Sequence, residues 1–230
     1  MEKLIALREE LKTLADIKYK EFHQGLLAGE FSVLGVRVPK LREISKRIAS
    51  ELNENEIKEF VNSESFYYEE KMIKGMVIGY LKSDKDVILD LLKGYVTKID
   101  NWGICDCVCA TLKIMKKEND YFYSFLEECL KSDKEFVVRF AIVCLLNHYV
   151  NDEYIDKIIE IIKRNYPDYY YIDMAIAWLI CDCFIKYPDK TKPLFDFGLK
   201  KFINNKAISK INDSFRVSKD DKELLKEKRK

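Results

Sequence analysis

The sequence contains little that bends or interrupts a chain, with only 8 glycines and 4 prolines in 230 residues. Folds made of many strands, or of alternating strands and helices, need more turn-forming positions than this. Also missing is any apolar run of the roughly 20 residues that cross a bilayer. The opening residues, MEKLIALREELKTL, mix acids with bases where an export signal would be continuously apolar. We therefore expect a helical, cytoplasmic protein.

The chain also has almost no net charge and lacks the common nucleotide-binding motifs. The formal net charge is +1, from 40 basic and 39 acidic residues. Total charge therefore neither predicts nor excludes binding to nucleic acid, which depends on how the charges are distributed. No phosphate-binding loop, dinucleotide fingerprint or serine-hydrolase elbow is present. Nucleotide-dependent and serine-hydrolase chemistry are disfavoured.

Seven cysteines form an odd set in a chain without an export signal, which indicates free thiols rather than disulfides. Cys105, Cys107 and Cys109 alternate along one expected helix. Side chains at i and i+2 of a helix point about 200° apart, so this spacing does not chelate one metal ion. We predict small buried side chains and no metal.

Helical periodicity runs through almost the whole sequence. Leu41, Ile44, Ile48 and Leu52 recur at helical spacing in a segment that opens with Pro39. From about residue 66, long apolar helices alternate with more amphipathic ones. The long helices are predicted to begin near Tyr67, Trp102, Glu135 and Tyr170, with partners at 86–99, 120–132, 152–165 and 190–203. This spacing of about 33 to 35 residues is typical of stacked helical pairs.

These repeats predict one all-α domain, a curved solenoid whose concave face is lined by one set of helices. Residues 1–65, with two or three helices, would cap the array. Residues 66–203 would form the helical pairs, and 204–230 a C-terminal helix with a frayed basic tail. No linker separates domains.

Charged residues interrupt three of the apolar helices, where an unpaired buried charge is costly. In WGICDCVCATL, Trp102, Asp106, Cys109 and Lys113 are predicted to share one stripe. Arg139 interrupts EFVVRFAIVCLL, and its charge must meet a carboxylate or an external anion. An ion pair with Asp106 that fixes repeat stacking and a phosphate from a ligand would each satisfy it.

The third helix, MAIAWLICDCF, carries Trp178 and Asp182. The pattern Trp-x-Ile-Cys-Asp-Cys occurs at both 102–107 and 178–183. This repetition is either a trace of duplication or a chance similarity, because the first copy opens its helix and the second lies within one.

Four segments in this order and spacing resemble the AlkD-type DNA alkylation repair proteins, a family of HEAT-like repeat glycosylases. They are FSVLGVRVPKLREI, DNWGICD, SDKEFVVRFAIV and YYYIDMAIAWLICDCFIKYPDK. The resemblance covers about residues 15–225. The stretch Asn101-Trp102-Gly103 stands where better-known members carry a tandem tryptophan pair, and resembles a different branch.

The resemblance implies a right-handed α–α superhelix that binds duplex DNA containing alkylated bases. It implies hydrolysis of the N-glycosidic bond of cationic N3- or N7-alkylpurines. The family's catalytic Asp falls on Asp106, its Arg on Arg139, and its two indoles on Trp102 and Trp178. No cofactor is implied: neither metal, nucleotide nor Schiff-base lysine is required.

Further basic residues are candidates for contacts with DNA, and we expect a monomer. The candidates are Arg37, Lys40, Arg42, Lys113 and Arg216. For each of them, an ordinary solvated surface charge is the competing interpretation. The alternative function is a non-catalytic helical scaffold that binds DNA or a protein partner.

Overall fold

The computed structural model describes residues 2–27 and 29–230, and of Glu2 only the backbone. Within these residues the chain is all helical, without a strand, as predicted. None of the helices there is both long and apolar enough to cross a bilayer. None of the seven cysteines forms a disulfide, and six of them are buried.

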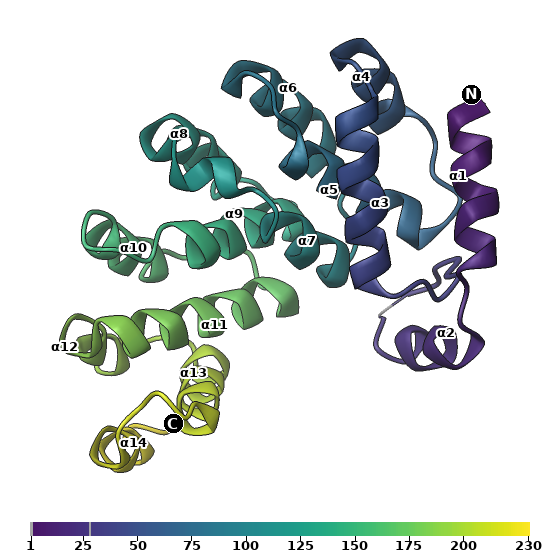
Figure 1. Ribbon diagram of the computed structural model, residues 1–230. Helices are drawn as coiled ribbons and strands as arrows, with labels where there is room; N and C mark the ends of the chain where they lie inside the picture. Colours follow the sequence, from purple (N-terminus) through teal and green to yellow (C-terminus); the bar gives the residue numbers. More distant parts are fainter. Residues whose placement is uncertain (1, 28) are drawn as a thin grey trace. The chain divides into compact units, whose positions relative to one another are not determined.

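The chain forms two compact units, divided after Glu118. The helices of the first unit are α1 (Glu2–Thr13), α2 (Ile17–Gln24), α3 (Val38–Glu51), α4 (Glu54–Asn62), α5 (Tyr68–Tyr80), α6 (Lys85–Val96), α7 (Trp102–Cys109) and the short 3-10 helix η1 (Lys113–Lys116). Helix α5 packs between α3 and α7, and α6 packs on both α4 and α5 (Figure 1). The unit therefore has a row α3–α5–α7 and a second row α4–α6.

The second unit repeats this arrangement. Its helices are α8 (Asn119–Cys129), α9 (Glu135–His148), α10 (Ile155–Ile162), α11 (Tyr170–Lys186), α12 (Pro188–Thr191), the 3-10 helix η2 (Lys192–Phe195), α13 (Lys201–Asp213) and α14 (Lys219–Lys226). Helix α11 packs between α9 and α13 (Figure 1), and α10 and α12 also pack on it. Helices α5 and α11, each with a neighbour on both flanks, are buried almost throughout, and α9 is buried over most of its length.

The predicted helical pairs are largely confirmed. The helices predicted to be long begin at Tyr68, Trp102, Glu135 and Tyr170, within one residue of the predicted positions, but the one at Trp102 has only 8 residues. The Pro39 helix is α3, with proline in its first turn. The prediction of a single domain and that of a superhelix stay predictions.

The predicted helix at 190–203 is wrong. Helix α12 ends at Thr191, a short 3-10 turn follows, and α13 begins only at Lys201. Pro193 lacks the N–H group that a helix interior needs, and Gly198 has a φ of +98°, which a right-handed helix does not tolerate.

Both ends of the chain are also more structured than expected. Residues up to 65 contain four helices rather than two or three, since Asp16 caps α2 and Asn53 forms a capping box at α4. The basic tail is not frayed. The Asn204 side chain donates to the Lys228 carbonyl at 2.9 Å, and Lys228 pairs with Asp196 at 2.6 Å.

Candidate active site

Helix α7 carries Trp102 and Asp106, and its first turn is built by the residues around it. The Asn101 side chain caps the helix by accepting from the Gly103 N–H at 2.8 Å. The same oxygen accepts from the Tyr68 hydroxyl at 3.1 Å. On the inner side of the helix, Ile104 and Val108 are buried. The start of α7 is thus held by a buried tyrosine of α5.

Trp102 and Asp106 lie four residues apart on α7, so they share a face, and both are half-buried. The predicted stripe does not extend further. Cys109 is fully buried, and α7 ends there, so Lys113 lies beyond the helix, exposed at the start of η1. The chain turns after Cys109, with Thr111 turned into the core, and this turn breaks the helical spacing on which the prediction relied.

Cys107, the residue that follows Asp106 on α7, is half-buried. Burial raises the pKa of the Cys107 thiol, Arg42 offsets part of this rise, and the Asp106 carboxylate adds to it. Arg42 therefore lies within electrostatic reach of this turn of α7. Its guanidinium donates to the Tyr80 hydroxyl at 3.1 Å. Arg42 is thus held by Tyr80 of α5 and acts electrostatically on Cys107, the residue after Asp106.

The indole of Trp102 faces helix α2. Its Nε1 donates to the Leu26 carbonyl at 3.4 Å, a long hydrogen bond just past the end of that helix. Helix α2 has no buried residue, and it exposes Ile17 and Phe22 to solvent at 74% and 63%. The Trp102 indole N–H is therefore bound by the segment that follows α2, a helix with no buried residue.

The other basic candidates of this unit lie at the start of α3 and are exposed. Arg37 pairs with Asp16 at 2.9 Å and stacks over Tyr19, with 4.9 Å between guanidinium carbon and ring centroid. Lys40 pairs with Glu43 at 2.6 Å. Surface pairs of this kind are weak and exchange readily for other partners.

In the second unit, Arg139 is buried in α9, with 5% of its surface exposed. Its Nη1 donates to the Tyr171 carbonyl at 2.7 Å, and its guanidinium carbon lies 5.7 Å from the Tyr171 ring centroid. The Tyr171 N–H in turn donates to Glu135 at 2.8 Å. Arg139 is thus oriented by the first turn of α11. Because Asp106 and Arg139 belong to different units, an ion pair between them stays a prediction.

Trp178 and Asp182 lie one turn apart on α11, and each has a cation nearby. The Lys210 ammonium of α13 lies 5.6 Å from the Trp178 ring centroid. Arg216, which follows α13, lies 3.7 Å from the Asp182 carboxylate. Sequence reasoning missed Lys210 because nothing in the sequence distinguishes it from the other basic residues of the expected C-terminal helix.

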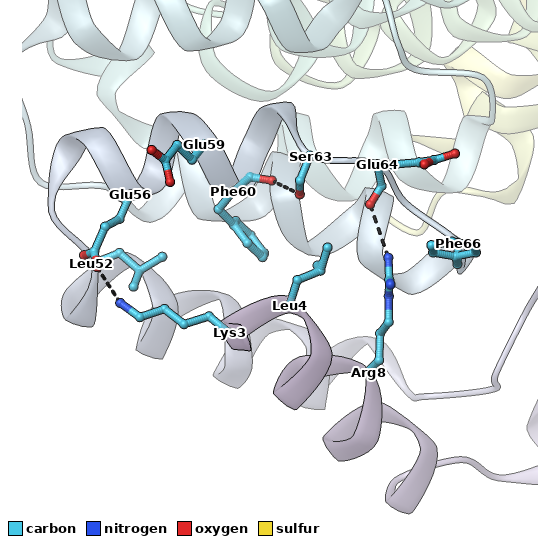
Figure 2. A pocket seen from close by; sticks show the side chains of 10 residues that line it. All are labelled: Lys3, Leu4, Arg8, Leu52, Glu56, Glu59, Phe60, Ser63, Glu64 and Phe66. Carbon is cyan, nitrogen blue, oxygen red and sulfur yellow. Dashed lines mark hydrogen bonds and ion pairs between the residues drawn. The ribbon is translucent and has the colours of Figure 1, made fainter. Parts of the chain in front are cut away.

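None of these residues lines the cavity at the N-terminal end of the first unit. That cavity measures about 700 Å³ and lies among α1, α4 and segment 63–66 (Figure 2). Its lining residues are Lys3, Leu4, Arg8, Leu52, Glu56, Glu59, Phe60, Ser63, Glu64 and Phe66. Its basic side chains are already engaged, Lys3 with Glu56 and Arg8 with Glu70. Across residues 2–27 and 29–230, no three His, Cys, Asp or Glu side chains group to hold a metal.

Comparison with known families identifies the chain. The family model described as DNA alkylation repair enzyme matches residues 7–195. The chain belongs to this family. No protein of curated function and no solved structure matches it significantly.

Membership in the DNA alkylation repair enzymes confirms the resemblance read from the sequence. The matched range includes Trp102, Asp106, Arg139 and Trp178. It ends at residue 195, before α13, so Lys210 and Arg216 lie outside the part that matches the family. A role in DNA repair with DNA as the substrate follows from the family.

Proposed function

We propose that the protein is a DNA glycosylase that hydrolyses the N-glycosidic bond of cationic N3- or N7-alkylated purines in duplex DNA. The observation that carries the proposal is the family match across residues 7–195, together with a half-buried carboxylate, Asp106, one turn from an indole inside that range. The right-handed superhelix of HEAT-like pairs belongs to the same proposal.

The chemistry fits a site with one carboxylate. An alkylated purine already bears a positive charge and leaves as a neutral base, so it needs no general acid. The reaction's main requirement is to stabilise the positive charge that develops on the deoxyribose. A carboxylate shielded from bulk water does so electrostatically, and it also orients the attacking water, as in glycoside hydrolysis. We assign both tasks to Asp106.

The remaining residues would bind and orient the substrate. Indoles pack against a sugar or a cationic base, which we assign to Trp102 and Trp178. Arg139 would hold a phosphate beside the lesion through its planar, bidentate guanidinium. Among the basic candidates we keep Arg42 as a DNA contact, because its charge acts on Cys107, the residue next to Asp106.

The test is release of 7-methylguanine and 3-methyladenine from methylated duplex DNA. We expect wild type to release them and Asp106→Asn to be slower by roughly two to three orders of magnitude, the usual effect of removing one electrostatic group. Asp189→Asn, a matched change at an almost fully exposed position, should have no effect. DNA binding by wild type without base release would favour a non-catalytic scaffold, and equal release by both enzymes would exclude the role of Asp106.

A further inference from the structure

Helix α11 carries a second tryptophan–aspartate pair at the same spacing as Trp102 and Asp106. Trp178 and Asp182 are four residues apart in one regular helix, so both face the same side, and both are half-buried. The residues between them, Leu179, Ile180 and Cys181, are buried. An indole face and a carboxylate are the two protein groups that attract organic cations most directly.

Each member of this pair already has a cation of the same chain beside it. Lys210 lies over the Trp178 indole, 5.6 Å from its centroid, and Arg216 lies 3.7 Å from Asp182. The Arg216 separation is too long for a hydrogen bond, and 67% of its side chain is exposed. Arg216 also lies in the short segment between α13 and α14. It is therefore free to move away from Asp182 without disturbing a helix.

The neighbouring cations offset only part of the cost of burying the negative charge of Asp182. Burial raises its pKa, and the charges of Arg216, Lys186 and Lys210 counteract only part of that rise. A cation that lay closer than 3.7 Å would stabilise the ionised carboxylate further. The pair thus has the capacity to bind a better-fitting cation.

We infer that Trp178 and Asp182 form a recognition site for a planar organic cation, and that Lys210 and Arg216 are exchangeable stand-ins for it. The inference rests on the proposed function for the identity of the ligand, an N-alkylated purine ring. Such a ring is flat enough to stack on the indole, carries the charge that the carboxylate attracts, and presents N–H donors to it. When it binds, Lys210 and Arg216 are displaced and become available to the phosphates on either side of the lesion.

The experiment uses the free nucleosides 7-methylguanosine and guanosine, so that it measures recognition without base release. Calorimetric titration of the full-length protein at about pH 6, where carboxylates are ionised, gives the affinities. Trp102→Phe leaves Trp178 as the only indole, and its indole N–H resonance reports whether the nucleoside stacks there. We expect 7-methylguanosine to bind at least tenfold more tightly than guanosine and to shift this resonance.

Variants then distinguish the effect of the Asp182 carboxylate from the effects of Lys210 and Arg216. Asp182→Asn should weaken 7-methylguanosine binding about tenfold and leave guanosine binding unchanged, while the exposed control Asp189→Asn changes neither. Lys210→Gln and Arg216→Gln should tighten nucleoside binding severalfold because a competing cation is removed. The same two variants should weaken binding to duplex DNA and lower its salt dependence by about one counterion each.

For Lys210→Gln and Arg216→Gln, tighter binding of the nucleoside together with weaker binding of duplex DNA distinguishes this inference from a purely structural role of the two residues. Equal affinity for the two nucleosides, no effect of Asp182→Asn, or weaker nucleoside binding by Lys210→Gln would each overturn it. Arg216→Gln alters an exposed side chain, so it keeps the test valid if a half-buried variant unfolds. Absence of base release from methylated DNA would refute the proposed function alone, since no nucleoside measurement depends on catalysis.

Discussion

The Tyr68 hydroxyl occupies the space into which a side chain on Gly103 would grow. A Cβ atom at position 103 would lie closer than 3.0 Å to this oxygen, a separation that real Cβ atoms essentially never show. Tyr68 has little freedom to move away, because it is 2% exposed and its ring packs against His23 and Phe31. This packing accounts for the glycine that follows Trp102.

We therefore expect Gly103→Ala to destabilise the protein by roughly 1–3 kcal/mol, as overpacking of a core does. It should also slow base release, because it shifts the turn that carries Trp102. Tyr68→Phe removes the obstructing oxygen and should cost about 1 kcal/mol, the value of the hydrogen bond to Asn101. The double variant should be more stable than Gly103→Ala alone. Urea unfolding measures all three, and strictly additive losses would show that the hydroxyl is not the obstacle.

Much of the fold followed from the sequence because the apolar periodicity reports burial directly. Helices α5, α9 and α11 are buried over most of their length, so their continuous apolar runs were predictable and their first residues were placed within one position. The prediction was wrong at 190–203, where Pro193 and Gly198 end the helix inside a segment that still alternates apolar and polar residues. Local backbone restrictions prevailed there over the periodic pattern.

The candidate site was only partly predictable, for a different reason. Asp106 and Arg139 stand out as charges within apolar helices, so the sequence alone indicates them. Lys210 lies among ordinary basic residues of α13 and becomes notable only through its distance to the Trp178 ring. Contacts of this kind join residues that are far apart in the sequence, and periodicity carries no information about them.

Lys74 is a buried cation, and it yields a prediction about pH. It is 2% exposed, and its ammonium donates to the Ser63 and Glu64 carbonyls and to the Ser65 hydroxyl, at 2.6, 3.2 and 2.8 Å. Burial lowers the pKa of Lys74 to about 8 from its ordinary 10.5. Between these two pKa values, Lys74 binds a proton more fully in the unfolded chain than in the folded protein. Its contribution therefore makes the free energy of unfolding increase with pH.

The cost of burying the charged lysine should thus be fully present below about pH 8 and disappear as the pH rises to about 10.5. Over this range the contribution to the free energy of unfolding is on the order of 3 kcal/mol. We expect Lys74→Met to lose this increase relative to wild type. Lys71→Met, at a more exposed position on the same helix, should keep it. Urea unfolding across the pH series checks this, and parallel profiles for wild type and Lys74→Met would contradict it.

Glu69 organises the loop that precedes α3 and carries Arg37. Its buried carboxylate accepts from the backbone N–H groups of Leu34, Gly35 and Val36, at 3.1, 2.8 and 3.3 Å. An amide of the same shape offers one acceptor oxygen and no charge, and hydrogen bonds to charged groups are each worth about 1.5–3 kcal/mol. Glu69→Gln should therefore lower stability by roughly 2–4 kcal/mol.

The same change should speed amide hydrogen exchange at positions 34–36 before it affects the rest of the protein. Glu43→Gln, an exposed acid on α3, serves as the matched control and should alter neither quantity. If Glu69→Gln left the exchange rates of these three amides unchanged, the carboxylate would not be what holds the loop.

A double-mutant cycle decides whether Asp106 and Arg139 act together in catalysis or only in helix packing. If both act in one reaction, Asp106→Asn removes most of the rate, and Arg139→Gln on top of it adds little, since residues that act as a unit are strongly non-additive. Arg139→Gln alone should also cost roughly 1–3 kcal/mol of stability, because it removes the charged donor to the Tyr171 carbonyl from a buried position.

Base release per folded molecule and urea unfolding are measured for both single variants and the double variant. Arg164→Gln provides the control, because Arg164 forms an ion pair with Glu127 at 2.8 Å, and neither residue belongs to the proposed site. Coupling that appears in the unfolding free energies but not in the rates would mean that Asp106 and Arg139 only fix helix packing. Coupling in the rates is the expected outcome, because a carboxylate that stabilises the sugar cation is effective only when the neighbouring phosphate holds that sugar in place.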